Sequence, residues 1–247
     1  MITVRITEAG RKILAELADI GTEISLVEIR AGHPTPCSFI LVNGLTGSRT
    51  LINRKASGGN LRLDTRQLRR LSPKFLLFDG HEPKASLQAL ERFPGVPSLL
   101  DAGSLREGTA ALAGKVTYLV ASEKFAQQTC GWDLRSGKRA RRAAVARLRQ
   151  LYSHVVVITL GERGLIGDVG AGYFEMPALR VKTVDTTGAG DVFHGALAYA
   201  LRRRFEFMAA LSWASVAAAL SVQRFGGRPS IPKLSEVKQA WRPQWKQ

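Results

Sequence analysis

The sequence contains little cysteine and no long apolar run. Its 247 residues include two cysteines, Cys37 and Cys130, which lie far apart and show no metal-ligand spacing. Neither a disulfide framework nor a zinc site is therefore expected. No stretch approaches the ~18 consecutive apolar residues that read as a membrane span, and the first five residues lack the apolar core of a signal peptide. We expect a globular protein of the cytoplasm with two free thiols and no membrane partner.

Acidic residues are also scarce. The chain has 20 aspartates and glutamates and 36 lysines and arginines, which gives a formal net charge of +16. By itself this charge favours a polyanion as partner. It is concentrated in residues 135–149 and 202–204, where no aromatic residue is interleaved as base stacking would require. We therefore interpret it as a solvated basic face and do not expect a nucleic-acid partner.

From residue 74 onward, short apolar runs alternate with amphipathic stretches. Expected strands at 75–79, 98–101 and 118–121 are each followed by an expected helix, at 83–92, 106–112 and 123–129, and a long basic helix then leads to a central strand at 154–160. A β hairpin at 165–167 and 173–176 and two alanine-rich helices at 190–203 and 207–222 complete the series. Such alternation predicts an α/β fold in which helices cover both faces of a mostly parallel sheet.

The part before residue 74 has a different pattern. A helix is expected at 7–20 and a strand at 24–29, and two β runs at 37–42 and 49–53 flank Asn43-Gly44, a step that favours a hairpin turn. No low-complexity linker separates this part from the rest. We therefore predict one domain over residues 1–247, with a β hairpin or lid at 36–54.

The stretch Asp185-Thr-Thr-Gly-Ala-Gly-Asp191 is the best candidate for a reactive centre. Its glycines allow a tight turn, and the helix that follows begins with unpaired N–H groups that suit an anion such as phosphate. A carboxylate at Asp191 would repel that anion unless it had another task, and the natural one is general base for a substrate hydroxyl. The alternative is an ordinary capped helix start, since Asp and Thr are common cap residues.

Three motifs in order carry a resemblance to a known family. The stretch 185–191 resembles the signature of the ribokinase-like (PfkB) carbohydrate kinases, Thr159-Leu-Gly-Glu-Arg-Gly164 resembles their nucleotide-binding loop, and 224–232 resembles the segment that closes over adenine. The resemblance implies a three-layer α/β/α sandwich of the ribokinase type. It also implies a kinase that transfers the γ-phosphoryl group of ATP to a sugar hydroxyl.

The resemblance also assigns roles to residues. Asp191 would be the base, and the backbone amides of Gly188, Ala189 and Gly190 would form the anion hole. The residues implied for Mg-ATP are Ser122, Thr159, Gly161, Glu162, Gly164, Gly190 and Ser215. A monovalent cation, K⁺, would be held by the side chains of Asp185, Thr187 and Ser230 and by carbonyls near Ser221, Arg224 and Gly226. Lid-mediated dimerisation in the family makes a homodimer an open possibility.

The chain departs from the family pattern at two places. Where many members carry Asn-x-x-Glu, this chain has Ser122-Glu-Lys-Phe125, a variant that resembles the ketohexokinase-like branch. The first strand, part of the lid and a Gly-Gly-x-x-x-Asn turn of the sugar site are also expected to be missing, since Gly58-Gly-Asn60 comes too late to take that role. The alternative to an active kinase is therefore an ATP-binding relic or a regulatory or interaction protein.

Five further positions are interpreted from their residue types alone. His194 is expected to be a packed histidine rather than a second base, and Trp213 to be in the core. His81 and Glu82 follow a strand end and either touch substrate or belong to a plain loop. Asp101 also ends a strand, and the two interpretations of it, a neighbour of the phosphates or a cap of the next helix, stay open.

Overall fold

The computed structural model describes residues 3–5, 7–30, 33–45, 49–54, 61, 63–152 and 155–242. The chain divides into two compact units. Unit 1 comprises Met1–Val42 and Arg49–Leu71, and unit 2 comprises Asn43–Ser48 and Ser72–Gln247. The Gly58–Asn60 stretch and the first residue of the predicted strand at 154–160 lie outside the described residues.

Unit 2 is built on a six-stranded sheet in the order β10-β9-β8-β7-β6-β5. The strands are β5 (Leu76–Phe78), β6 (Ser98–Ala102), β7 (Tyr118–Ser122), β8 (Val155–Thr159), β9 (Leu165–Asp168) and β10 (Tyr173–Met176). Strands β5 to β8 pair in parallel, while β9 and β10 add an antiparallel hairpin at one edge. The mostly parallel sheet predicted from the sequence is confirmed.

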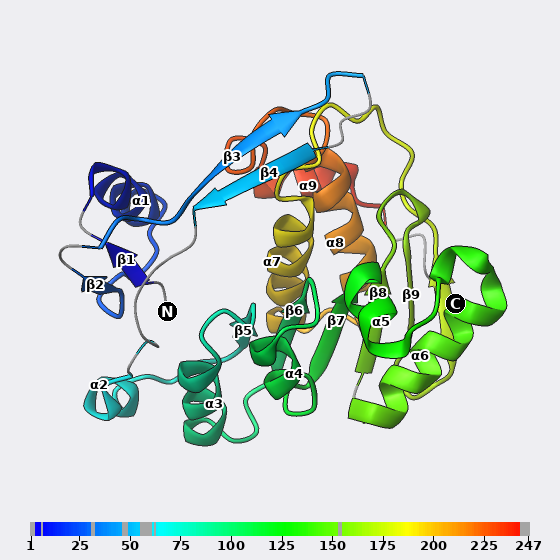
Figure 1. Ribbon diagram of the computed structural model, residues 1–247, viewed down its shortest axis with the longest axis horizontal. Coiled ribbons are helices and arrows are strands. Elements are labelled where there is room, and N and C mark those ends of the chain that lie inside the picture. Colours follow the sequence, from blue (N-terminus) through cyan, green and yellow to red (C-terminus); the bar gives the residue numbers. More distant parts are fainter. Residues whose placement is uncertain are drawn as a thin grey trace. The chain divides into compact units, whose positions relative to one another are not determined.

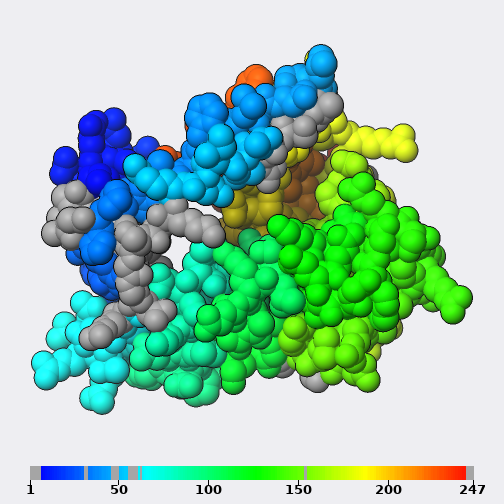
Figure 2. All heavy atoms as spheres, viewed as in Figure 1, coloured from blue at the N-terminus to red at the C-terminus, as the bar shows by residue number. Residues whose placement is uncertain are grey.

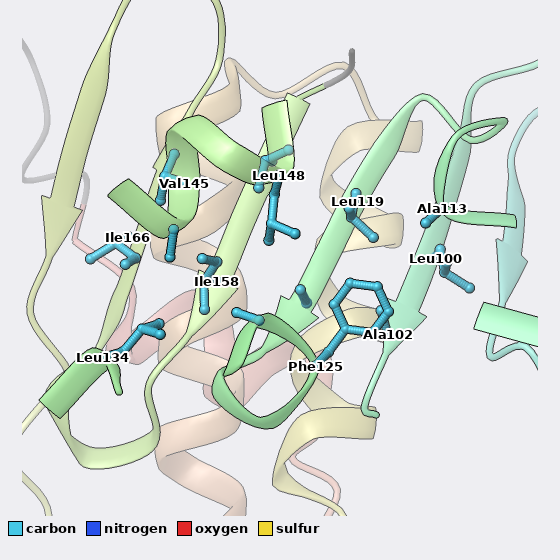
Figure 3. Close-up of a cluster of buried hydrophobic side chains, with 14 of the residues drawn as sticks. Leu100, Ala102, Ala113, Leu119, Phe125, Leu134, Val145, Leu148, Ile158 and Ile166 are labelled. Carbon is cyan, nitrogen blue, oxygen red and sulfur yellow. The ribbon is translucent and has the colours of Figure 1, made fainter. Parts of the chain in front are cut away.

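Side chains that alternate along each strand divide the core of unit 2 into two halves. Leu119 and Ala121 of β7 join the cluster under α5 (Glu123–Cys130) and α6 (Lys138–Tyr152), whereas Val120 between them joins the cluster under α7 (Ala189–Arg202) and α8 (Phe207–Ser221). Figure 3 shows the first half, with Phe125 and Leu148 reaching the sheet from their helices. Because both faces are buried, the strands read as continuous apolar runs in the sequence.

Shorter helices complete the layers of unit 2. On the side of the first cluster lie α3 (Pro83–Arg92) and α4 (Glu107–Ala113), and α9 (Leu234–Ala240) packs on α8 (Figure 1). Figure 2 shows the residues of α3 to α6, coloured in the green range, as a continuous surface layer. Trp213 is 3% exposed and packs against Trp241 and Phe205, as the core assignment predicted.

Unit 1 is small and contains two separate two-stranded sheets. Strands β1 (Thr3–Arg5) and β2 (Glu28–Arg30) pair in parallel around helix α1 (Glu8–Asp19), and β3 (Cys37–Val42) pairs antiparallel with β4 (Arg49–Arg54). A five-residue helix, α2 (Thr65–Arg69), follows. The hairpin at 37–54 and the helix with Thr7 as its N-cap agree with the sequence patterns.

Part of the basic charge has a structural task. On α6, Arg141 lies 3.7 Å from Glu175, Arg149 lies 3.9 Å from Asp168, and the guanidinium of Arg142 stacks over the ring of Tyr173 at 4.8 Å. These contacts attach the basic helix to the β9–β10 hairpin. The interpretation of a purely solvated basic face therefore needs this correction for three of its arginines.

Several expectations about elements were wrong. The strand expected at 24–29 is limited to β2, Glu28–Arg30. The sequence patterns also missed β1, α2 and α9. All three are short and polar, so no periodic apolar signal marks them.

Candidate active site

The start of α7 is a tight glycine turn. Its N-cap, Gly188, has the left-handed φ of 76°, which glycine adopts without strain. The Val192 amide donates to the Gly188 carbonyl at 2.9 Å, and the Ala189 amide donates to Thr186 across the turn at 3.3 Å. The amides of Gly190 and Asp191 come before Val192, the first intrahelical donor, and point out of the helix start. A side-chain carbon added at Gly190 would meet no atom within 4 Å, so open space adjoins these donors.

A buried carboxylate fastens the turn to the C-terminal segment. Asp185 is 3% exposed, and its Oδ1 accepts from the Thr187 amide at 2.8 Å while its Oδ2 accepts from the Gly226 amide at 2.8 Å. The backbone around it is held by Val222, whose carbonyl accepts from the amides of Val184 and Asp185. The turn and the segment near Gly226 thus form one connected structure, as the cation-site prediction requires.

The other predicted cation ligands gather around the same place. Ser221 and Ser230 are buried, and their hydroxyls donate to the carbonyls of Ala218 and Gly227 at 2.8 Å. Within the described residues, the buried Thr187 Oγ1 has no hydrogen-bond partner. Arg224 is anchored by an ion pair with Glu236 of α9. An unpaired buried hydroxyl beside a buried carboxylate is a donor set that fits a cation.

Four of the seven predicted nucleotide residues line a pocket of about 430 Å³. Its lining residues are Gly103, Ser122, Glu123, Lys124, Arg135, Thr159, Leu160, Gly161, Glu162 and Arg163. The volume is within the range of ligand pockets, ~300–1,000 Å³. Cations outnumber acids in the lining, which suits an anionic ligand. Four of the predicted nucleotide residues therefore share one pocket, at the carboxyl ends of β7 and β8 where open α/β sheets bind ligands.

One acid of the pocket is neutralised internally. The Glu123 carboxylate is 2.6 Å from Arg163 and 3.9 Å from Arg135. Ser122 has a structural role too, since its Oγ accepts from the Phe125 amide at 3.1 Å, capping α5, and donates to the Gly103 carbonyl at 2.8 Å. The sequence showed no sign of the Glu123–Arg163 pair, because its members lie 40 positions apart.

Gly164 and Ser215 are not among the residues that line this pocket. Gly164 has a φ of 88° and packs against the backbone of Met176 and Ala178, leaving no room for a side chain. Ser215 of α8 reaches the Met176 sulfur from its Oγ at 4.0 Å. Both predicted nucleotide residues thus contact Met176, Gly164 at its backbone and Ser215 at its side chain. Their contact with a nucleotide stays a prediction.

Asp101 lies at the end of β6 and faces His194 of α7. The Asp101 Oδ2 is 3.2 Å from the His194 Nδ1, and α4 begins at Arg106 without any help from Asp101. Asp101 is therefore not the cap of the next helix. Burial raises the pKa of the Asp101 carboxyl above its ordinary value; the His194 ring opposes this shift, and the carboxylate of Asp191 adds to it. The coupling indicates that Asp101 and Asp191 share one electrostatic environment.

His81 belongs to a polar network at the end of β5. Its Nδ1 is 3.0 Å from the Asp79 carboxylate, and its Nε2 is 3.0 Å from the guanidinium of Arg106. Burial opposes ionisation of Asp79, but the hydrogen bonds and charge of His81 outweigh it and lower the Asp79 pKa. The hydrogen bond to Asp79 raises the His81 pKa. Arg106 can only donate, so its contact favours the neutral ring. No described contact of these residues tests a role in substrate binding.

Comparison with known proteins gives the family. Residues 6–234 match the model of the pfkB family carbohydrate kinases, which covers both units. The chain belongs to this family. A 95-residue stretch, 38% of the chain, is 42% identical to the ribokinase of Lactococcus lactis and spans 32% of that protein. Over 245 residues, 93% of the chain, it is 27% identical to the ribokinase of Arabidopsis thaliana and spans 64% of it.

Solved structures agree on the fold. The ribokinase of Thermotoga maritima superposes with a TM-score of 0.81 at 25% identity, over 96% of this chain and 78% of that one. The Arabidopsis thaliana ribokinase complexed with ribose and ATP superposes with a TM-score of 0.79 at 23% identity, over 96% and 80%. The ribokinase-like α/β fold is confirmed. The chain matches less than two thirds of either curated relative named above, and these matches, all ribokinases, do not confirm a ketohexokinase-like branch.

Two structural facts bear on the remaining expectations. In the described part of the chain, no helix is long and apolar enough to cross a membrane, and no cluster of three or more His, Cys, Asp or Glu side chains could hold a metal ion. Both cysteines are free thiols, as predicted.

Proposed function

We propose that this chain is an ATP-dependent carbohydrate kinase that transfers the γ-phosphoryl group of ATP to a sugar hydroxyl. The observation that carries the proposal is the start of α7, where outward amides of Gly190 and Asp191 and the exposed Asp191 side chain share one turn. Amides at a helix start attract a phosphoryl group, and a carboxylate beside them accepts the proton of the attacking hydroxyl. Membership of a carbohydrate-kinase family supports the same reaction.

The chain's own residues divide the work as follows. Asp191 takes the proton from the sugar hydroxyl, and the amides of Gly188, Gly190 and Asp191 stabilise the negative charge of the transferred group. Ala189 was predicted as a further donor. Because its amide already donates a long hydrogen bond to the Thr186 carbonyl, we expect it to contribute less to stabilising this charge.

The nucleotide occupies the pocket at the ends of β7 and β8. Ser122, Thr159, Gly161 and Glu162 line it, and the neighbouring Gly164 and Ser215 shape the adenine side. Magnesium, which neutralises phosphate charge when bound, keeps waters and phosphate oxygens as most of its ligands. The absence of a carboxylate cage from the described residues is compatible with this mode of binding.

A K⁺ ion is proposed beside the anion hole, held by Asp185, Thr187 and neighbouring carbonyls. Asp185→Asn is expected to lower the free energy of unfolding by about 1–3 kcal/mol, because an amide cannot accept from both Thr187 and Gly226. Turnover of the wild type should be higher in KCl than in choline chloride, and the variant should lose this difference. Urea unfolding and steady-state assays in the two salts measure the effects.

The matched control is Asp133→Asn. Asp133 also accepts from the amide two residues ahead, Arg135, at 2.9 Å, but it is exposed. We expect it to cost less than ~0.5 kcal/mol and to leave the salt response intact. Equal turnover of the wild type in both salts would remove the cation from the proposal.

Ribose is the first sugar to test, because the named relatives are ribokinases. Purified protein is incubated with Mg-ATP and ribose, 2-deoxyribose, fructose or a nucleoside, and ADP release is followed. We expect sugar-dependent release with a pentose. A preference for fructose would instead favour the ketohexokinase-like branch indicated by Ser122-Glu123. ATP binding without turnover on any acceptor would refute the kinase and leave an ATP-binding relic or regulatory protein.

Two further predictions remain proposals. A homodimer is supported by the apolar hairpin of unit 1, where the cross-strand pair Phe39 and Ile52 is 64% and 65% exposed, and solution molecular mass tests it. The cytoplasmic location and the absence of a nucleic-acid partner stay predictions from the sequence.

A further inference from the structure

The imidazole of His194 is surrounded by hydrogen-bond acceptors. The residue is 5% exposed. Its Nδ1 is 2.6 Å from the Gly190 carbonyl oxygen and 3.2 Å from the Asp101 Oδ2, and its Nε2 is 3.4 Å from the Val120 carbonyl oxygen. Because the groups at Nδ1 can only accept, or accept in their ionised form, this nitrogen carries a proton and donates it. The ring therefore connects the first turn of α7 to strands β6 and β7.

The Gly190 carbonyl has a special position in the proposed site. It belongs to the same planar peptide unit as the Asp191 N–H, and in a trans peptide the two bonds point in opposite directions. A donor that fixes the direction of the Gly190 carbonyl therefore also fixes the direction of the Asp191 N–H. That N–H is one of the outward amides at the helix start.

This peptide unit needs such a restraint. Gly190 lies in the first turn of α7, where the helix ladder brings the backbone N–H of His194 to the same carbonyl. Glycine at 190 still leaves this turn more conformational freedom than other residues would, so a second donor at the carbonyl adds to the restraint. A carbon added at Gly190 would meet no atom within 4 Å, so this side of the turn is not packed against another element. A hydrogen bond to the carbonyl also polarises the peptide and makes its N–H a better donor.

We propose that His194 is a positioning residue of the proposed phosphoryl-transfer site, in which its Nδ1–H holds the Gly190 carbonyl and so aims the Asp191 amide at the anion. Asp101 orients the ring through the same Nδ1–H. The edge of the Phe193 ring, 5.7 Å away between centroids at 83°, fills the remaining side. The role rests on the proposed kinase function, since it concerns the anion hole of that reaction.

Three substitutions separate the hydrogen bond from the volume of the ring. Asparagine places an amide nitrogen near the position of Nδ1, glutamine places one near Nε2, and phenylalanine keeps the ring without a donor. We expect His194→Phe and His194→Gln to lower kcat at least about tenfold, less than the ~10²–10³ for deleting a donor outright. KM for ATP and sugar should change less than about twofold, since the pocket is untouched. His194→Asn should restore most of the lost turnover.

A measurement without turnover distinguishes failure of this inference from failure of the kinase proposal. Hydrogen exchange of the first turn of α7 is compared in the ligand-free proteins. Exchange should be faster in the Phe and Gln variants than in the wild type and in His194→Asn. Leu197→Ala is the control, because Leu197 is fully buried one turn further along α7 but does not touch the Gly190 carbonyl. It should destabilise the protein without selective loosening of the first turn.

Both the kinetic measurement and the hydrogen-exchange measurement can reject the positioning role of His194. Wild-type kcat in His194→Phe, or equal defects in the Asn and Gln variants, overturns the positioning role. If the wild type phosphorylates no sugar, the kinase proposal fails, and the exchange pattern alone decides whether His194 restrains the turn. Exchange in His194→Phe that is no faster than in Leu197→Ala rejects it.

Discussion

Asp191→Asn is expected to lower kcat by about 10²–10⁴-fold, the share that a positioned general base contributes. The two side chains have the same shape, so the helix start and its outward amides are preserved. The amide, however, cannot take the proton of the attacking hydroxyl. ATP affinity should change little, because the predicted nucleotide pocket does not include Asp191. Sugar-dependent ADP release measures the first effect and calorimetric titration with ATP the second.

The control for this variant is Glu107→Gln. Glu107 is an exposed acid in the first turn of α4, as Asp191 is in the first turn of α7. It therefore shares any general effect of a first-turn charge on a helix dipole, about 0.3–1 kcal/mol. Glu107→Gln should leave kcat within about twofold of the wild type. A similar loss in both variants, or full turnover in Asp191→Asn, would show that Asp191 is not the base.

The sequence predicted the elements of unit 2 well for a physical reason. A strand buried on both faces must be apolar throughout, so β7 and β8 are visible as continuous runs. Helix ends were visible where local chemistry sets them, as with Thr7 before α1 and Pro83 at the start of α3. Strands β1 and β2 have three residues each and pair across the chain. Neither their length nor their composition indicates which strand each of them pairs with.

The candidate site was predictable only in its local parts. The glycine turn at 185–191 reads directly from residue types, because a tight turn before a helix needs glycine. The pairing of Asp101 with His194 does not, since the two residues are 93 positions apart and meet only because β6 ends beside α7. A buried polar residue at a strand end and another in an apolar helix were each visible. Only the fold shows that these two residues lie in contact.

Gly164→Ala is expected to destabilise the protein by about 3 kcal/mol or more, through strain and overpacking together. The backbone at Gly164 has a φ of 88°, which an L side chain rarely adopts. An added carbon would also lie 2.6 Å from the Ala178 amide nitrogen and closer still to the Met176 carbonyl oxygen. Neither neighbour is a flexible side chain, so backbone on one side must move. ATP binding should weaken with it, because the loop from 159 to 163 lines the pocket.

Gly161→Ala in the same loop separates the two contributions to this loss. Gly161 also has a positive φ, 63°, but a carbon added there meets no atom within 4 Å. Its substitution carries only the conformational cost, about 1–2 kcal/mol. Urea unfolding gives the loss in free energy of unfolding for each variant. The difference between the two losses measures how much the close approach of Gly164 to the backbone after β10 costs when a side chain is added. Equal losses would mean that the Met176–Ala178 backbone moves away without cost. Gly164 would then be required for its φ alone and not for packing beside the nucleotide pocket.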